Sequence, residues 1–127
     1  MQQVPPFHPI GVVRNGLPLG TPRKEMEAAE SEIRLDPRFL SGLDGLAAEP
    51  KILVVFLFHL SDGYDLHQHP RGDTTRPTRG VFALRSPRRP NPIGVTEVDL
   101  LEINENTLRV RGLDAVDGTP VLDLKPA

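Results

Sequence analysis

Residues 51–60, KILVVFLFHL, contain the longest apolar run of the chain, seven residues from 52 to 58 followed by His59. The run is short and rich in β-branched and aromatic residues, which favour a strand over a helix. It predicts a central strand buried on both faces. His59 stands where this strand would reach the surface. Two interpretations are equally open for it, a side chain lining a pocket or a hydrogen-bonded histidine at a strand end.

The remaining sequence predicts more short strands joined by turns. The expected strands cover residues 9–14, 31–35, 80–84, 93–103, 107–115 and 120–124. Asn104 and Asn106 are typical of a hairpin turn, and the irregular apolar alternation after residue 93 predicts a bulge. One short helix is expected at 36–45, where an N-cap Asp36 precedes a proline. Residues 15–29 are expected to form a turn-rich loop, and residues 61–78 a long irregular one.

Length and pattern limit the fold class. A chain of 127 residues with 38 % hydrophobic and 25 % charged residues suits a single domain, residues 1–127. Six or seven short strands, without the long helices that parallel βαβ units need, predict a mainly β fold. Such strands are expected to close as a small barrel or to pack as a sandwich.

Several classes of site are disfavoured by composition. There is no cysteine, so disulfides, thiolate zinc sites and cysteine nucleophiles are excluded. His67 and His69 lack a convincing third ligand, and a polar loop without metal is the favoured interpretation. No glycine-rich nucleotide-binding motif occurs. The apolar runs are too short for a bilayer span or a signal peptide, which predicts a cytoplasmic protein with no membrane partner.

The charge is unevenly distributed. The net charge is −2, yet residues 71–90 contain six arginines and one acid, a local balance of +5 that leaves −7 for the rest. A basic segment on an acidic protein suits a polyanion such as RNA. A solvated, arginine-rich loop is the alternative interpretation.

Residues 85–92, RSPRRPNP, form the most unusual segment. Pro87, Pro90 and Pro92 fix φ and hold the residues before them extended. Three backbone donors are missing, so we expect carbonyl oxygens free to face a ligand, with Asn91 offering both a donor and an acceptor. A stiff loop of this kind lowers the ordering cost of binding.

Two aspartates, Asp114 and Asp117, lie three residues apart before the last predicted strand. Asp117 begins the sequence DGTP, which is typical of a turn. The two carboxylates either point toward one site or serve only to form turns.

Longer segments resemble a known family. Residues 80–103, GVFALRSPRRPNPIGVTEVDLLEI, and 108–126, LRVRGLDAVDGTPVLDLKP, are similar to the signature of the tRNA-methyltransferase O family, also called YaeB-like or TsaA-like. Residues 10–24, IGVVRNGLPLGTPRK, resemble its opening strand and PRQ-type loop, with Lys24 in place of the glutamine. The resemblance extends over residues 10–126.

The resemblance implies a homodimeric, single-sheeted antiparallel β-barrel that binds S-adenosyl-L-methionine without a Rossmann fold. It implies methylation of N6 of threonylcarbamoyl-adenosine next to the anticodon of a tRNA. Two alternatives stay open: a methyltransferase acting on another RNA or a small molecule, and a non-enzymatic module that binds S-adenosyl-L-methionine.

Site residues follow from the same resemblance. Cofactor contacts are expected from Pro22, Arg23, Lys24, His59, Leu60, Arg85, Gly94, Val95, Asp117, Gly118, Thr119 and Pro120. Substrate contacts are expected from Arg76, Arg79, Arg88 and Arg89, and catalytic roles from Asn91 and Asp117. A urea-like nitrogen needs to lose its proton to become nucleophilic. Asp114, Asp117 and His59 are the alternatives for the acceptor.

Overall fold

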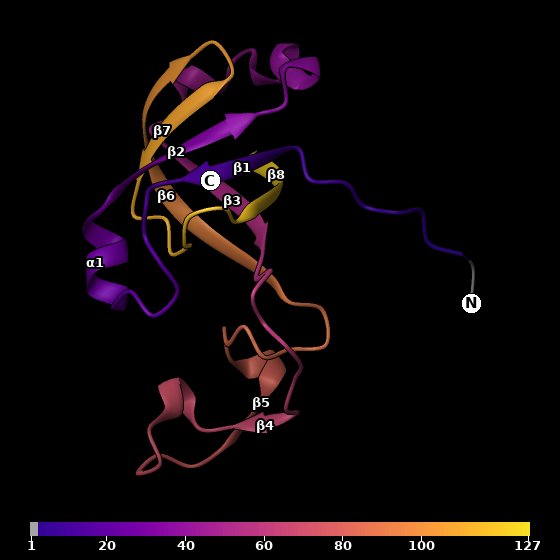
Figure 1. The fold of residues 1–127 in the computed structure, drawn as a ribbon, viewed down its shortest axis with the longest axis vertical. Coiled ribbons are helices and arrows are strands. Elements are labelled where there is room, and N and C mark those ends of the chain that lie inside the picture. The colour runs from indigo at the N-terminus through magenta and orange to yellow at the C-terminus, as the bar shows by residue number, and fades with distance from the viewer. Residues whose placement is uncertain (1–2) are drawn as a thin grey trace.

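The computed structural model describes residues 3–127 and contains a closed barrel of six antiparallel strands (Figure 1). In the order of their pairing, the strands are β1 (Gly11–Arg14), β2 (Glu30–Leu35), β7 (Thr107–Arg111), β6 (Ile93–Asn104), β3 (Lys51–Leu57) and β8 (Pro120–Pro126). β8 pairs in turn with β1 and closes the sheet. The prediction of a mainly β, antiparallel barrel is confirmed.

Short helices are more numerous than expected. The predicted helix is present as the 3₁₀ helix η1 (Pro37–Leu43), and the Asp36 carboxylate accepts a hydrogen bond from the Arg38 backbone N–H at 3.1 Å. The prediction of a loop throughout residues 15–29 was wrong, because Arg23–Ala28 forms the helix α1. An ion pair of 2.8 Å between Arg23 and Glu27, one turn apart, supports it. Three further 3₁₀ helices are η2 (Leu46–Ala48), η3 (Pro70–Gly72) and η4 (Val81–Ala83).

Strand β3 is buried on one face only, so the prediction of burial on both was wrong. Ile52, Val54 and Phe56 point into the barrel and are at most 2 % exposed. Leu53 and Leu57 alternate with them and are half-buried on the outer side. A closed barrel has a single interior, so each strand can bury only alternate side chains there.

The predicted strand at 80–84 was also wrong. Only Arg79–Gly80 forms a strand, β5, which pairs with the two-residue β4 (His67–Gln68), and the chain then turns into η4. Val81 is buried, whereas Phe82 is 78 % exposed, so the apolar run does not occupy one buried face. Residues 58–92 form a lobe outside the barrel, between β3 and β6 in Figure 1.

The hairpin predicted at Asn104 and Asn106 and the bulge predicted after residue 93 are confirmed. β6 and β7 are joined through Glu105 and Asn106, and the Asn106 side chain donates to the Leu35 carbonyl at 2.7 Å. The pairing of the two strands shifts register between Leu100 and Glu102. The shift bends β6, the strand that leads from the lobe into the barrel.

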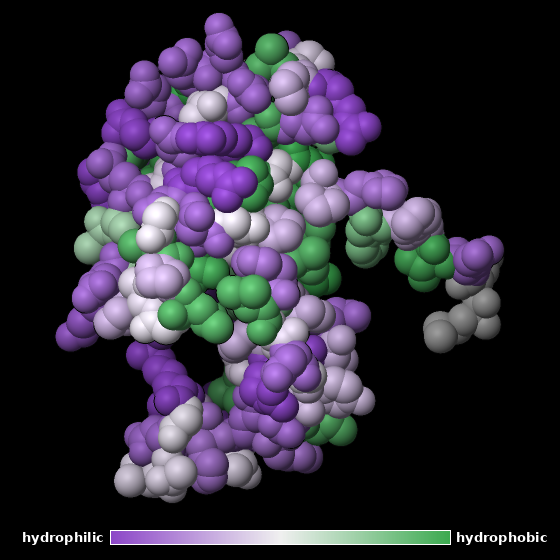
Figure 2. Space-filling view, viewed as in Figure 1, coloured by the Kyte–Doolittle hydropathy of each residue, from purple (hydrophilic) through white to green (hydrophobic). Residues whose placement is uncertain are grey.

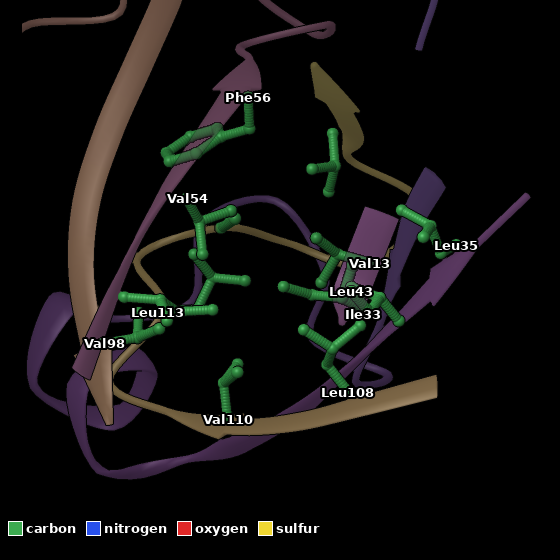
Figure 3. Packing of buried hydrophobic residues seen from close by; sticks show 13 residues of the cluster. Val13, Ile33, Leu35, Leu43, Val54, Phe56, Val98, Leu108, Val110 and Leu113 are labelled. Carbon is green, nitrogen blue, oxygen red and sulfur yellow. The ribbon is translucent and has the colours of Figure 1, made fainter. Parts of the chain in front are cut away.

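The barrel interior is filled by aliphatic side chains and one phenylalanine. Figure 3 shows Phe56 of β3, Leu108 and Val110 of β7 and Ile33 of β2 facing the same interior. Leu113, two residues after the end of β7, is fully buried among them. These residues come from strands distant in sequence, so the core holds the whole barrel together.

Close packing of β1 against β2 generates a test of the fold. A Cβ at Gly11 would lie 2.6 Å from the backbone oxygen of Arg34, which cannot move without disturbing β2. We expect Gly11→Ala to lower the free energy of unfolding by about 1–3 kcal/mol in urea denaturation. Gly42→Ala, where no heavy atom lies within 4 Å, serves as the control and should change it by less than about 0.5 kcal/mol. Equal effects of the two substitutions would contradict this account.

Candidate functional site

A groove separates the barrel from the lobe. It encloses about 870 Å³ and is visible in Figure 2 as a hollow between the two parts. The barrel contributes apolar residues of β3 and β6 and polar residues from α1 and the segment after β7. The lobe contributes η3, the segment before Pro87 and several arginines. The groove is thus apolar and partly acidic on one side and strongly basic on the other.

An aromatic floor lies on the barrel side. The rings of Phe56 and Phe58 meet edge to face, with centroids 5.2 Å apart. Gly94 is buried over these rings, and a Cβ there would lie 2.6 Å from the Phe56 ring and 2.9 Å from the Phe58 ring. Glycine at this position therefore leaves the two rings room at the floor of the groove. The partly exposed Phe58, backed by the buried Phe56, gives the floor an apolar surface that suits a ring of a ligand.

Arginines line the lobe side. Arg71, Arg76 and Arg85 are exposed along the groove, and within residues 3–127 none of them forms an ion pair. Arg71 also has φ of 53°, unusual for a residue other than glycine, and the His69 ring contacts the Arg76 carbonyl at 2.7 Å. The contact between His69 and Arg76 ties together the backbone of the basic wall, whose arginines line the groove.

Of the other predicted substrate arginines, two have partners inside the lobe and one lies outside the lining of the groove. Arg88 pairs with Asp62 and Asp65, each at 3.1 Å. Arg89 lines the groove, and its guanidinium donates to the Leu84 carbonyl at 2.9 Å. Arg79 is exposed on β5, outside the lining of the groove.

The proline loop uses most of its carbonyls internally. The Pro87 oxygen accepts from the Ser61 hydroxyl at 2.9 Å, and the Pro92 oxygen from the Phe58 backbone at 2.7 Å. Those of Ser86, Arg88 and Asn91 also accept bonds from within the chain. The expectation of carbonyls free for a ligand was therefore wrong for most of the loop. The Asn91 side chain itself is exposed and lies outside the lining of the groove.

The DGTP turn lies elsewhere, against β1. The Asp117 carboxylate accepts from the backbone N–H groups of Asn15 and Gly16 at 3.0 and 3.3 Å. These bonds lower the pKa of Asp117. Thr119 is buried and its hydroxyl donates to the Val116 carbonyl at 2.7 Å.

His59, at the end of β3, lies beside this turn. Its Nε2 atom is 4.0 Å from the position that a Cβ would occupy at Gly118. Both His59 and the neighbouring Leu60 are exposed. Because β3 and β8 are paired, the histidine and the turn meet at one end of these two strands.

Asp114 lies in the groove instead. It is half-buried, and this burial raises the pKa of its carboxyl. The charge of Arg23 opposes the rise and that of Glu27 adds to it. Sequence reasoning named Asp114 as one of three proton acceptors but did not choose among them. The choice depends on the environment that the fold creates around each group.

The predicted cofactor residues thus fall into two groups in one chain. Arg23, Arg85, Gly94 and Val95 line the groove, whereas His59, Asp117 and Gly118 gather near β1. The remaining predicted contacts lie outside the lining of the groove: Pro22, Lys24, Leu60, Thr119 and Pro120. All of these assignments stay predictions.

Sequence reasoning missed Phe56 and Phe58 as the floor of the groove and Arg71 as part of its basic wall. The two phenylalanines share the alternation of the central strand, which signalled only a core. A clue was available in Gly94, because a glycine inside a strand often marks the close approach of another group. Among residues 3–127, no three His, Asp or Glu side chains are placed to hold a metal ion, and no helix is long and apolar enough to cross a membrane.

Comparisons with known proteins agree with this architecture. The family model described as the tRNA-methyltransferase O N-terminal domain matches residues 15–127. The chain is 45 % identical over 123 residues to a probable S-adenosyl-L-methionine-binding protein of Methanothermobacter thermautotrophicus, covering 94 % of this chain and 88 % of that protein. It is 41 % identical over 122 residues to an S-adenosyl-L-methionine-binding protein of Archaeoglobus fulgidus, covering 92 % and 85 %.

A similar fold has been solved. The crystal structure of TrmO from Pseudomonas aeruginosa matches 100 % of this chain with a TM-score of 0.77 and 32 % identity. The match covers 56 % of that TrmO chain, so this chain spans little more than half of its length.

The bonds of Asp117 make stability depend on pH. Because the folded state lowers this pKa, the carboxylate stabilises the fold above the ordinary pKa of about 3.8, and the effect is lost as the pH falls through the folded-state value. We expect Asp117→Asn to reduce the free energy of unfolding at pH 7 and the difference from wild type to shrink below pH 3.8. Urea denaturation of both proteins between pH 2 and 7 measures this difference in the free energy of unfolding.

Asp44→Asn is the matched control, since the exposed Asp44 side chain forms no hydrogen bond within the described part of the chain. It should leave the pH profile unchanged. If Asp117→Asn lowered the free energy of unfolding by the same amount at every pH, the negative charge of Asp117 would have no role in stability.

Proposed function

This chain belongs to the tRNA-methyltransferase O family, and on that basis we propose that it binds S-adenosyl-L-methionine and methylates N6 of threonylcarbamoyl-adenosine beside the anticodon of a tRNA. The observation that carries the proposal is the groove, in which an aromatic floor faces a wall of arginines. The names of two close relatives support the choice of cofactor. The match to the solved TrmO fold supports the choice of reaction.

The groove offers complementary groups for both ligands. The partly exposed Phe58, supported by the buried Phe56 and Gly94, presents an apolar surface for a purine ring. Arg23 and Arg85 supply cations for the carboxylate of the cofactor. A positive charge on the bound sulfonium is matched by the acidic side of the groove, where Asp114 lies.

The basic wall suits the nucleic acid. Arg71 and Arg76 are free to bind RNA phosphates or the threonyl carboxylate. Arg79 extends this surface on β5, and Arg88 and Arg89 hold the lobe in the shape that presents it. Arginine is well suited to the task because its planar guanidinium binds phosphate and carboxylate in two-pronged fashion.

Bound S-adenosyl-L-methionine supplies a methyl group activated by its sulfonium. The contribution of the protein is positioning, since an in-line displacement depends on holding two reactants close and aligned. The stiff proline loop, tied to the lobe and to Phe58, fixes one side of the groove. Asn91 belongs to this loop but lies outside the lining of the groove, so its predicted orienting role is not part of this proposal.

We also propose that the active form is a homodimer. The two groups of predicted cofactor residues lie at different places on one chain, and a second copy would allow one group to complete the other. Exposed apolar residues provide contact surface: Leu60, Phe82 and Val95 are 51, 78 and 47 % exposed. Figure 2 also shows apolar surface on the barrel next to the groove.

A second function is favoured by a specific observation. The most similar relatives named above are described as binding S-adenosyl-L-methionine, with no reaction stated. A module that binds the cofactor without transferring its methyl group, or a methyltransferase for another RNA or a small molecule, is the alternative.

The test of the reaction is incorporation of label from methyl-labelled S-adenosyl-L-methionine into two tRNA pools, one containing threonylcarbamoyl-adenosine and one lacking it. We expect label only in the pool that contains the modified nucleoside. Label in both pools would indicate another RNA target. Cofactor binding without label in either would support the binding module.

The test of the dimer is complementation between two inactive variants, His59→Ala and Arg85→Ala, one from each group. If each site takes one group from each subunit, a mixture of the two variants should regain about a quarter of wild-type turnover, because half the dimers are mixed and each of those has one intact site. Sedimentation of the wild type should give twice the mass of one chain. Failure of the mixture to regain turnover would place both groups of a site on the same subunit.

A further inference from the structure

We propose that Asp114 is the proton acceptor of the reaction, taking the hydrogen from the substrate nitrogen as the methyl group arrives. The inference rests on the proposed function and deepens it, since it selects one of three residues that the sequence left equivalent. It is carried by the position of Asp114 in the groove and by the lack of a partner for its carboxylate among residues 3–127.

The backbone at Asp114 is held firmly. Leu113 before it is 0 % exposed and Ala115 after it 5 % exposed, and both belong to the barrel core. Asp114 lies between these two anchors and lines the groove. A side chain anchored in this way has little freedom to leave the site, which is the condition for effective proton transfer.

The Asp114 carboxylate has no hydrogen-bond or ion-pair partner among the described residues. Within residues 3–127 it accepts no hydrogen bond and forms no ion pair within 4.0 Å. It is nevertheless half-buried, and the described residues contain no fully buried side-chain oxygen or nitrogen without a partner. The oxygens of Asp114 are therefore accessible from the groove, where a substrate N–H can reach them.

The electrostatic setting favours a basic carboxylate. Burial raises the pKa of Asp114, which strengthens it as a proton acceptor. Arg23 lowers this pKa in part, but its guanidinium is paired with Glu27 at 2.8 Å. The other charged or titratable groups of the groove are Glu97 on β6 and, on the lobe, His69, Arg71, Arg76, Arg85 and Arg89.

The two other acceptors are less suitable. Asp117 accepts two backbone hydrogen bonds that lower its pKa, and it lies in a second hollow beside β1. His59 is exposed next to the DGTP turn, outside the lining of the groove. Among the carboxylates of the groove, Glu27 is paired with Arg23 and Glu97 is exposed on the outer face of β6.

Methyl transfer needs only S-adenosyl-L-methionine, the substrate nitrogen and the Asp114 carboxylate. The lone pair of the substrate nitrogen forms a bond to the methyl carbon, and the carbon–sulfur bond breaks with its electron pair going to sulfur. The N–H proton passes to the Asp114 carboxylate. The products are the N-methylated nucleoside, S-adenosylhomocysteine and a protonated Asp114, which then releases its proton to water.

The test compares wild type with Asp114→Asn, a variant of the same shape without the basic carboxylate. We expect single-turnover methyl transfer to tRNA containing threonylcarbamoyl-adenosine to fall about 10²–10⁴-fold. The dissociation constant for S-adenosyl-L-methionine, measured by calorimetry, should change less than about threefold. The wild-type rate should rise with pH as a single group loses its proton, and Asp114→Asn should lack this rise.

Controls separate chemistry from folding. Asp44→Asn changes an exposed aspartate directly after η1, outside the lining of the groove, and should leave rate and affinity unchanged. Asp114→Glu restores a carboxylate and should recover part of the rate. Urea denaturation of Asp114→Asn confirms that the variant is folded.

Two outcomes for the variant would overturn the proposal: a rate equal to wild type, or a loss of rate matched by an equal loss of cofactor affinity. If the proposed function is wrong, the wild-type protein itself lacks methyl transfer, whereas an error in the role of Asp114 shows only in the comparison of wild type with Asp114→Asn. A wild-type protein that binds the cofactor but methylates neither tRNA pool removes the reaction, and with it the role of Asp114.

Discussion

Closure of the barrel between β1 and β8 is the constraint on which the rest of the structure depends. The ladder between them is short, with Gly11 opposite Val121 and Val12 opposite Pro120. Backbone bonds from Ile10 to Val121 and from Val13 to Thr119 extend it. Closure creates the single interior that the aliphatic core fills, and it removes the free edges that an open sheet would expose.

The same closure places the candidate site. Because β3 and β6 are neighbours in the barrel wall, the 35-residue connection between them must leave the wall and return to it, and it forms the lobe. The groove lies where the lobe faces the barrel, so its floor belongs to the core strands and its opposite wall to the basic connection. The floor is rigid because Phe56 is also a core residue.

The electrostatics of the groove follow from which charges the chain neutralises for itself. Arg88 pairs with two aspartates of the lobe, and the carboxylate of Asp117 accepts hydrogen bonds from the backbone of Asn15 and Gly16, directly after β1. Arg71, Arg76 and Asp114 have no such partners among the described residues. Unpaired charges at a groove are available to a ligand, whereas paired ones support the scaffold.

Local pattern in the sequence determined most of the strands, the Asp36 cap, the hairpin at Asn106 and the DGTP turn, because each depends on the conformational preferences of a few adjacent residues. The family resemblance named the candidate residues. Only the tertiary structure decided that β3 is buried on one face, that residues 81–83 leave the strand, and that Asp114 and Asp117 occupy different environments. Burial and charge pairing arise from segments far apart in the chain, and no local pattern encodes which of them will meet.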